Sequence, residues 1–122
     1  MARILVIEDN PANLELAQYL LEHHGHTVLL ATDGKAGVSM ARRERPELIV
    51  CDLQMPVLDG YGVLDQLKGD GSMASVPIVA VTAFSMAGDE EKVRRAGFDG
   101  YVSKPIEPET FVQQIEAFLP PG

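Results

Sequence analysis

The stretch Leu48-Ile49-Val50-Cys51-Asp52-Leu53-Gln54-Met55-Pro56, residues 48–56, decides the fold. Four apolar residues in succession, without the alternation of a half-exposed strand, favour a strand covered on both faces, as in parallel sheets packed between helices. The run ends on the carboxylate of Asp52 and gives way to a proline-containing loop. Because ligands of such sheets bind outside the carboxyl ends of the strands, Asp52 stands where chemistry is expected. A strand-end aspartate can act as a nucleophile towards phosphorus.

Comparable apolar runs flank this stretch on both sides. Residues 3–7, 26–31, 77–81 and 100–103 predict four further strands. Helical spacing of apolar residues, an Asn10-Pro11 cap and terminating glycines predict helices between them. We expect these helices at about 11–24, 34–45, 61–68 and 88–96, with a last helix from about Pro108 whose inner face carries Phe111, Ile115, Phe118 and Leu119. This alternation predicts an α/β fold with one parallel sheet, covered on both faces and joined by right-handed crossovers.

Length, charge and cysteine content limit the kinds of protein that this chain can be. With 122 residues, 46% of them hydrophobic, residues 1–122 should form one domain with one core. Ten basic against 18 acidic side chains give a net charge of −8, which disfavours nucleic-acid binding because that usually needs a basic patch. The sequence has no apolar segment suited to a bilayer or a signal peptide, so we expect no membrane association and a cytoplasmic location. Cys51 is the only cysteine, which excludes an internal disulfide, and it should point into the core.

Functional groups follow four of the predicted strands: Glu8-Asp9 the first, Asp52 the third, Thr82 the fourth and Lys104 the fifth. In a parallel sheet they gather at one edge. Carboxylates packed together repel and disfavour one another's ionisation unless a cation lies between them. Hard oxygen ligands without histidine or cysteine favour Mg²⁺, which also binds phosphate oxygens. An ammonium, a hydroxyl and a metal ion can each stabilise a phosphoryl group in transfer, so the set predicts phosphoryl chemistry.

The motifs at these strand ends carry a resemblance to a known family. Ile4 to Asp9, Cys51 to Pro56 with Asp59-Gly60, Val81-Thr82-Ala83 and Tyr101 to Pro105 resemble, in order and spacing, the motifs of two-component response-regulator receiver domains. The resemblance runs nearly end to end. Within that family the chain is similar to free-standing single-domain receivers, including the DivK-like cell-cycle regulators, because residues 79–89 (VAVTAFSMAGD) are similar and the chain ends after its fifth helix.

This resemblance implies a flavodoxin-like, doubly wound five-stranded parallel sheet with strand order 2-1-3-4-5. It implies that Asp52 accepts a phosphoryl group from the phosphohistidine of a partner. It also implies that Mg²⁺ is held directly by Asp9 and Asp52, through water by Glu8, and by the backbone carbonyl of Gln54. Glu8 departs from the aspartate that is frequent at its position, which affects the geometry of the metal-bound water.

The same resemblance gives roles to the other motif residues. Lys104 would pair with the phosphoryl group, Thr82 would hydrogen-bond to it, and Ala83 would leave room for it. Lys104-Pro105 would be a cis peptide. Tyr101 would turn inward on activation.

Partners and output also follow from the resemblance. The phosphodonor would be a sensor histidine kinase or a histidine phosphotransferase, and the chain would be a phosphoacceptor rather than an enzyme acting on other substrates. The face formed by the fourth helix, fifth strand and fifth helix would bind a downstream protein, with Arg94 and Arg95 as polar contacts. We expect a monomer or a weak, phosphorylation-linked dimer. Gln54 and Phe84, beside the site, leave the dephosphorylation rate open.

Three other functions use similar features. A small Mg²⁺-dependent aspartyl-phosphate phosphatase also needs a strand-end aspartate, but it usually has a second aspartate two residues on, where this chain has Gln54. An FMN carrier of flavodoxin type binds phosphate after the first strand, where Glu8-Asp9 would repel it. A phosphorylation-independent binding module would not need the complete set of acids, Thr82 and Lys104.

Overall fold

The computed structural model describes residues 2–71, 73–83 and 87–119, with a side-chain description for all of these except 87 and 88. The five predicted strands are present as β1 (Arg3–Ile7), β2 (Thr27–Ala31), β3 (Leu48–Asp52), β4 (Ile78–Thr82) and β5 (Gly100–Ser103). The helices are α1 (Pro11–His23), α2 (Gly34–Glu44), α3 (Gly60–Lys68), α4 (Ala87–Ala96) and α5 (Phe111–Glu116).

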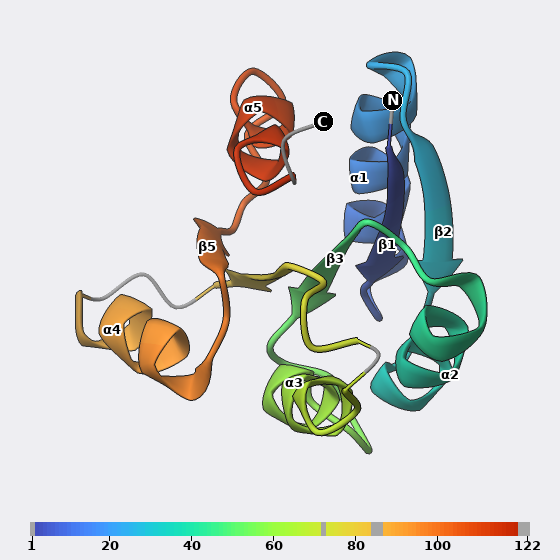
Figure 1. Cartoon of the computed structure of the whole chain (residues 1–122). Helices are drawn as coiled ribbons and strands as arrows, with labels where there is room; N and C mark the ends of the chain where they lie inside the picture. The colour runs from blue at the N-terminus through green and yellow to red at the C-terminus, as the bar shows by residue number, and fades with distance from the viewer. Residues whose placement is uncertain (1, 72, 84–86, 120–122) are drawn as a thin grey trace.

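The strands form one parallel sheet in the order β2-β1-β3-β4-β5, which confirms the expected flavodoxin-like topology. Helices α1 and α5 lie on one face of the sheet, and α2, α3 and α4 lie on the other (Figure 1). Because β3 is the middle strand, it has a neighbour on each side and helices on both faces. All five residues of β3 are buried, as its unbroken apolar run predicts.

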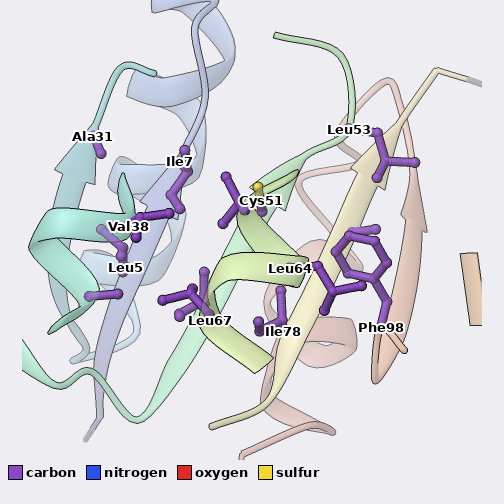
Figure 2. Close-up of a cluster of buried hydrophobic side chains, with 14 of the residues drawn as sticks. Leu5, Ile7, Ala31, Val38, Cys51, Leu53, Leu64, Leu67, Ile78 and Phe98 are labelled. Carbon is purple, nitrogen blue, oxygen red and sulfur yellow. The ribbon is translucent and has the colours of Figure 1, made fainter. Parts of the chain in front are cut away.

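Two apolar layers hold the sheet between its helices. One face of the sheet directs Leu5, Ile7 and Cys51 towards α2 and α3, where they pack with Leu64 and Leu67 (Figure 2). Alternate residues of the same strands, such as Ile4 and Val50, pack on the other face with α1 and α5. Cys51 is fully buried in the first layer, as predicted.

The register brings the carboxyl ends of the strands level with one another. Ile7 of β1 is paired with Cys51 of β3, so that Glu8 follows at the height of Asp52. Asp52 is in turn paired with Val81, and Thr82 is paired with Ser103. The four predicted functional positions therefore lie along one edge of the sheet, as the strand-end pattern indicates.

Helix boundaries agree with the capping signals, except at the last helix. Asn10, Asp33 and Asp59 each accept a hydrogen bond from a backbone N–H three residues on, as N-cap side chains do. The last helix is shorter than expected, because residues 108–110 form a turn and the helix begins only at Phe111. Phe118 lies beyond its end, although its side chain still packs against the core. No helix in the described ranges is long and apolar enough for a membrane span.

Gly60, the first residue of α3, lies directly against the chain that leaves β3. A Cβ at Gly60 would be 2.7 Å from the carbonyl oxygen of Asp52 and 2.8 Å from the Cα of Leu53. These are backbone atoms, which cannot rotate away as the end of a side chain can. The absence of a side chain at Gly60 therefore sets how closely α3 approaches the functional edge.

We expect Gly60→Ala to lower the free energy of unfolding by about 1–3 kcal/mol, because the added methyl group forces the helix away from the strand end. Urea denaturation monitored by circular dichroism measures this change. Gly71→Ala is the matched control, since a Cβ at Gly71 meets nothing within 4 Å. Equal denaturation midpoints for the two variants would contradict the close packing of α3.

Candidate functional site

Three carboxylates meet at the carboxyl edge of the sheet. Glu8 and Asp9 follow β1, and Asp52 ends β3. One oxygen from each of the three lies within 4.8 Å of the others. Glu8 and Asp52 are both only 4% exposed, whereas Asp9 is exposed to solvent. The structure thus brings together the three predicted acidic residues, two of them largely out of water.

Lys104, which follows β5, reaches across the edge to these carboxylates. Its Nζ lies 3.0 Å from Oε1 of Glu8 and 3.2 Å from Oδ2 of Asp52. Its backbone N–H donates to the carbonyl of Thr82 at 2.8 Å, which ties the end of β5 to the end of β4. The predicted cis peptide between Lys104 and Pro105 is confirmed. The pairing of Lys104 with Glu8 was not predicted from the sequence.

Backbone groups fix the remaining oxygens of the two buried acids. The N–H of Asn10 donates to Oε2 of Glu8 at 3.2 Å, and the N–H of Gln54 donates to Oδ1 of Asp52 at 3.3 Å. The N–H of Leu53 bonds to the carbonyl of Val81 at 3.1 Å, so the chain stays attached to β4 just beyond Asp52. Asp52 consequently presents its carboxylate in a fixed position at the edge.

Burial and the close contacts between charged groups shift the pKa of two residues in the site. Burial, followed by the neighbouring Asp52 carboxylate, raises the pKa of Glu8 from 4.5 to about 7, although the Asn10 N–H and Lys104 act in the opposite direction. Burial by itself would lower the pKa of Lys104, but its contacts with Glu8 and Asp52 outweigh burial and raise this pKa. One ammonium therefore does not fully compensate the clustered acids.

The donor set fits a hard divalent cation. All three side chains offer carboxylate oxygens, and the atoms are close enough together to share one ion. Histidine and cysteine ligands are absent from this cluster, which disfavours zinc and copper. Glu8, Asp9 and Asp52 are thus the residues that would hold Mg²⁺. The backbone carbonyl of Gln54 stays a predicted fourth ligand.

A cavity of about 280 Å³ opens beside the acidic cluster, between α3 and α4. Thr82, which is fully buried at the end of β4, lines it together with Tyr61 and Lys92. The Nζ of Lys92 lies 5.6 Å from the centre of the Tyr61 ring. Tyr101 is half-buried on β5 and packs at the margin of the same core layer as Tyr61. The predicted hydroxyl of Thr82 therefore borders a space into which side chains can move, and Tyr101 packs against the adjoining core layer.

One further predicted residue borders the site. Ala83 directly follows Thr82 and is exposed, which agrees with a position open to a ligand. Phe84 lies outside the described residues.

Asn10 is a site residue that sequence reasoning assigned only as a helix cap, although its N–H also bonds to Glu8. Its proximity to Glu8 in the sequence was the available signal.

Comparison with known proteins gives one family along nearly the whole chain. Residues 4–116 match the model of the response regulator receiver domain. The polar-differentiation response regulator DivK of Brucella anthropi is 38% identical over 116 residues, which cover 95% of this chain and 94% of the relative. The protein of the same name from Brucella ovis is 37% identical over the same share of each chain.

Solved structures agree with this match. The chemotaxis response regulator CheY4 of Vibrio cholerae has the same fold, with a TM-score of 0.92 and 24% identity over 98% of this chain and 99% of that one. The receiver domain of a sensor histidine kinase from Pseudomonas aeruginosa is 33% identical, with a TM-score of 0.87 and 96% of each chain covered. That structure holds a magnesium ion coordinated in its active-site cleft.

The raised pKa of Glu8 makes stability depend on pH in a defined direction. Since the folded state binds the proton more tightly than the unfolded state, stability that is present below pH 4.5 is lost as the pH rises to about 7. We expect Glu8→Gln to remove this loss, so that the unfolding free energy of the wild type falls relative to the variant by about 3 kcal/mol over this range.

Urea denaturation at a series of pH values, in the presence of a chelator, measures the difference. Glu15→Gln, on the exposed side of α1, is the control for the loss of one negative charge. Parallel pH curves for the wild type and Glu8→Gln would show that folding does not raise the pKa of Glu8.

Proposed function

This chain belongs to the family of response regulator receiver domains, the phosphoacceptor modules of two-component signalling, and we propose that Asp52 is the residue that accepts the phosphoryl group. One observation carries this proposal: the buried Asp52 carboxylate lies 3.2 Å from the Lys104 ammonium, beside the Glu8 and Asp9 carboxylates. A nucleophile, a cation for the incoming phosphoryl oxygens and a set of metal ligands thus occupy one edge of the sheet.

The proposed reaction transfers a phosphoryl group from a histidine of a partner protein. An oxygen of the Asp52 carboxylate attacks phosphorus, the P–N bond breaks, and its electron pair returns to the imidazole nitrogen. The product is an acyl phosphate on Asp52. Lys104 already lies against Asp52, so its ammonium can bond to a phosphoryl oxygen without leaving the site. Lys104 would then give up its contact with Glu8.

Mg²⁺ suits this reaction because bound metal neutralises phosphoryl charge and the repulsion among the acids. Glu8, Asp9 and Asp52 would hold it, in agreement with the close spacing of their oxygens. The related Pseudomonas aeruginosa domain, with magnesium in its cleft, supports this choice of metal. Glu8, whose pKa is raised to about 7, would have to lose its proton to bind the metal. Proton loss becomes easier as the pH rises towards this value and above it.

The switch is proposed to pass from Thr82 to Tyr101. A phosphoryl oxygen would accept a hydrogen bond from the Thr82 hydroxyl and draw the end of β4 towards Asp52. The cavity that Thr82 lines gives the space in which neighbouring side chains can rearrange, and Tyr101 lies on β5, the strand next to β4. A difference of a few kcal/mol between the two arrangements is enough for phosphorylation to shift the population.

The face formed by α4, β5 and α5 is the proposed output surface. Arg94 and Arg95 are exposed on α4, where they pair with Glu90 and Glu91 one turn earlier. Exposed pairs of this kind contribute little to stability, so a protein partner can replace them at low cost. A downstream protein would therefore meet side chains that are free to change partners.

Receiver domains interact with histidine kinases or histidine phosphotransferases, and we propose one of these as the phosphodonor. We further propose a cytoplasmic location, a monomer or weak phosphorylation-linked dimer, and no catalysis beyond the phosphorylation and dephosphorylation of Asp52 itself. The single buried cysteine and the excess of acidic side chains support a reducing compartment and a protein rather than a nucleic-acid partner.

With acetyl phosphate and Mg²⁺, we expect the wild type to gain one acid-labile phosphoryl group, and Asp52→Asn to gain none, because the amide is not a nucleophile. Intact-mass spectrometry measures the gain. Omission of Mg²⁺ should abolish the labelling. Asp65→Asn, on the exposed side of α3, is the control. Equal labelling of Asp52→Asn and the wild type would refute the assignment.

Beryllofluoride, which stands in for the phosphoryl group, should shift the NMR resonances of Thr82, Tyr101 and the face formed by α4, β5 and α5 more than those of α2. The expected order follows from the position of the cavity between Thr82 and α4. Titration of the labelled protein in Mg²⁺ measures it, and Asp52→Asn is the control. If α2 shifted most while Tyr101 stayed unchanged, the proposed switch would be wrong.

A further inference from the structure

Val57 combines two unfavourable properties at the edge that carries Asp52. Its side chain is 95% exposed, and within the described residues only Tyr19 is another large hydrophobic residue with high exposure. Its backbone has a φ of 71°, in the left-handed region that a β-branched residue rarely adopts. The N–H of Leu58 donates to the carbonyl of Pro56 at 2.8 Å, which makes Val57 the centre of a three-residue turn.

The loop around Val57 is firmly attached to the fold. On either side of it, Met55 is buried and Leu58 packs against the core layer beneath α3. The N–H of Gly60 bonds to the carbonyl of Leu53 at 3.0 Å, which closes the loop at its base. The strained turn is therefore held by its surroundings, and it directs the Val57 side chain into solvent.

The free molecule gains nothing from a valine in this conformation. Asparagine or glycine would adopt the same φ with less strain, and neither would expose apolar surface. Strain held by rigid surroundings at a reactive edge points to a function in a complex. We propose that Val57 is an apolar anchor that contacts the phosphodonor protein while its phosphohistidine is brought to Asp52.

The position of the loop determines this choice of partner. The loop begins directly after Asp52, and the N–H of Gln54 within it bonds to the Asp52 carboxylate. A protein that delivers a phosphoryl group to Asp52 must cover this rim, whereas a small phosphodonor need not. The inference rests on the proposed function, since it requires transfer from a protein. A rigid, pre-formed anchor loses little conformational freedom on binding, which suits a short-lived complex.

The test compares a protein phosphodonor with a small one. A panel of histidine kinase cores and phosphotransferase proteins, phosphorylated on histidine, is screened for the fastest donor to the wild type, and acetyl phosphate is the small donor. With the protein donor, we expect the rate constant of Val57→Asn and Val57→Gly to fall about fivefold or more, as for loss of an interface anchor. With acetyl phosphate, both variants should stay within about twofold of the wild type.

Two controls separate docking from folding. Val57→Ile keeps the apolar, β-branched side chain, and Ala74→Asn changes an exposed residue outside the loop; both should stay within about twofold of the wild type with either donor. The melting temperature of Val57→Asn should equal or exceed that of the wild type, because asparagine tolerates this φ better.

Three results would overturn the proposal: unchanged transfer from the protein donor to Val57→Asn, an equal fall with both donors, or a wild type that acetyl phosphate labels but that accepts nothing from any protein of the panel. A wild type in which neither donor labels Asp52 would instead refute the proposed function itself.

Discussion

The structure of the functional edge depends on one ammonium group between two buried carboxylates. The register of the parallel sheet places Glu8 level with Asp52, and a third carboxylate, Asp9, lies within reach of both. Lys104 contacts Glu8 and Asp52 at 3.0 and 3.2 Å. One positive charge faces three acids, so the edge keeps an excess of negative charge. Burial, followed by the neighbouring Asp52 carboxylate, raises the pKa of Glu8. A site built in this way favours ligands that bring positive charge or take up the ammonium, and a metal-bound phosphoryl group does both.

The sequence was sufficient for the fold and for placing the acidic residues and Lys104 at one edge of the sheet. Apolar runs long enough for buried strands, separated by capping residues and glycines, predicted all five strands. The family resemblance predicted their order in the sheet. The rule that parallel strands present their carboxyl ends at one edge then gathered Glu8, Asp52 and Lys104 without any knowledge of distances. These predictions succeed because they depend on chain direction and periodicity, which are properties of the sequence.

The predictions failed where the outcome depends on side-chain geometry. The contact between Lys104 and Glu8 joins residues that follow β5 and β1, two strands that are not neighbours in the sheet. Only the side-chain rotamers in the folded state decide which acid the ammonium meets. The start of α5 was placed about one turn too early, because apolar spacing does not separate a turn at residues 108–110 from the helix that follows. Nothing in the residue type of Val57 indicates a positive φ, since glycine and asparagine are the usual signals.

The two helices of the proposed output face are held very differently, which bears on how a signal could travel. Helix α5 buries Phe111, Val112 and Ile115, and its last residue, Glu116, accepts a 2.7 Å hydrogen bond from Nε2 of His26. The other ring nitrogen of His26 accepts a hydrogen bond from the backbone N–H of Ala2, so a buried ring ties the end of α5 to the residue that precedes β1. This arrangement requires the proton to sit on Nε2, because Nδ1 acts as an acceptor.

Helix α4 has no comparable anchor in its described part. Of its side chains at positions 89–96, only Val93 is buried, and the polar pairs of Glu90 and Glu91 with Arg94 and Arg95 lie within the helix itself. The cavity that Thr82 lines also lies under α4. A displacement of Thr82 would therefore be transmitted more easily to α4 than to α5, because few apolar contacts must be broken to move it. On this account α5 would be the fixed part of the proposed output face, and α4 would be the part that moves when Asp52 is phosphorylated.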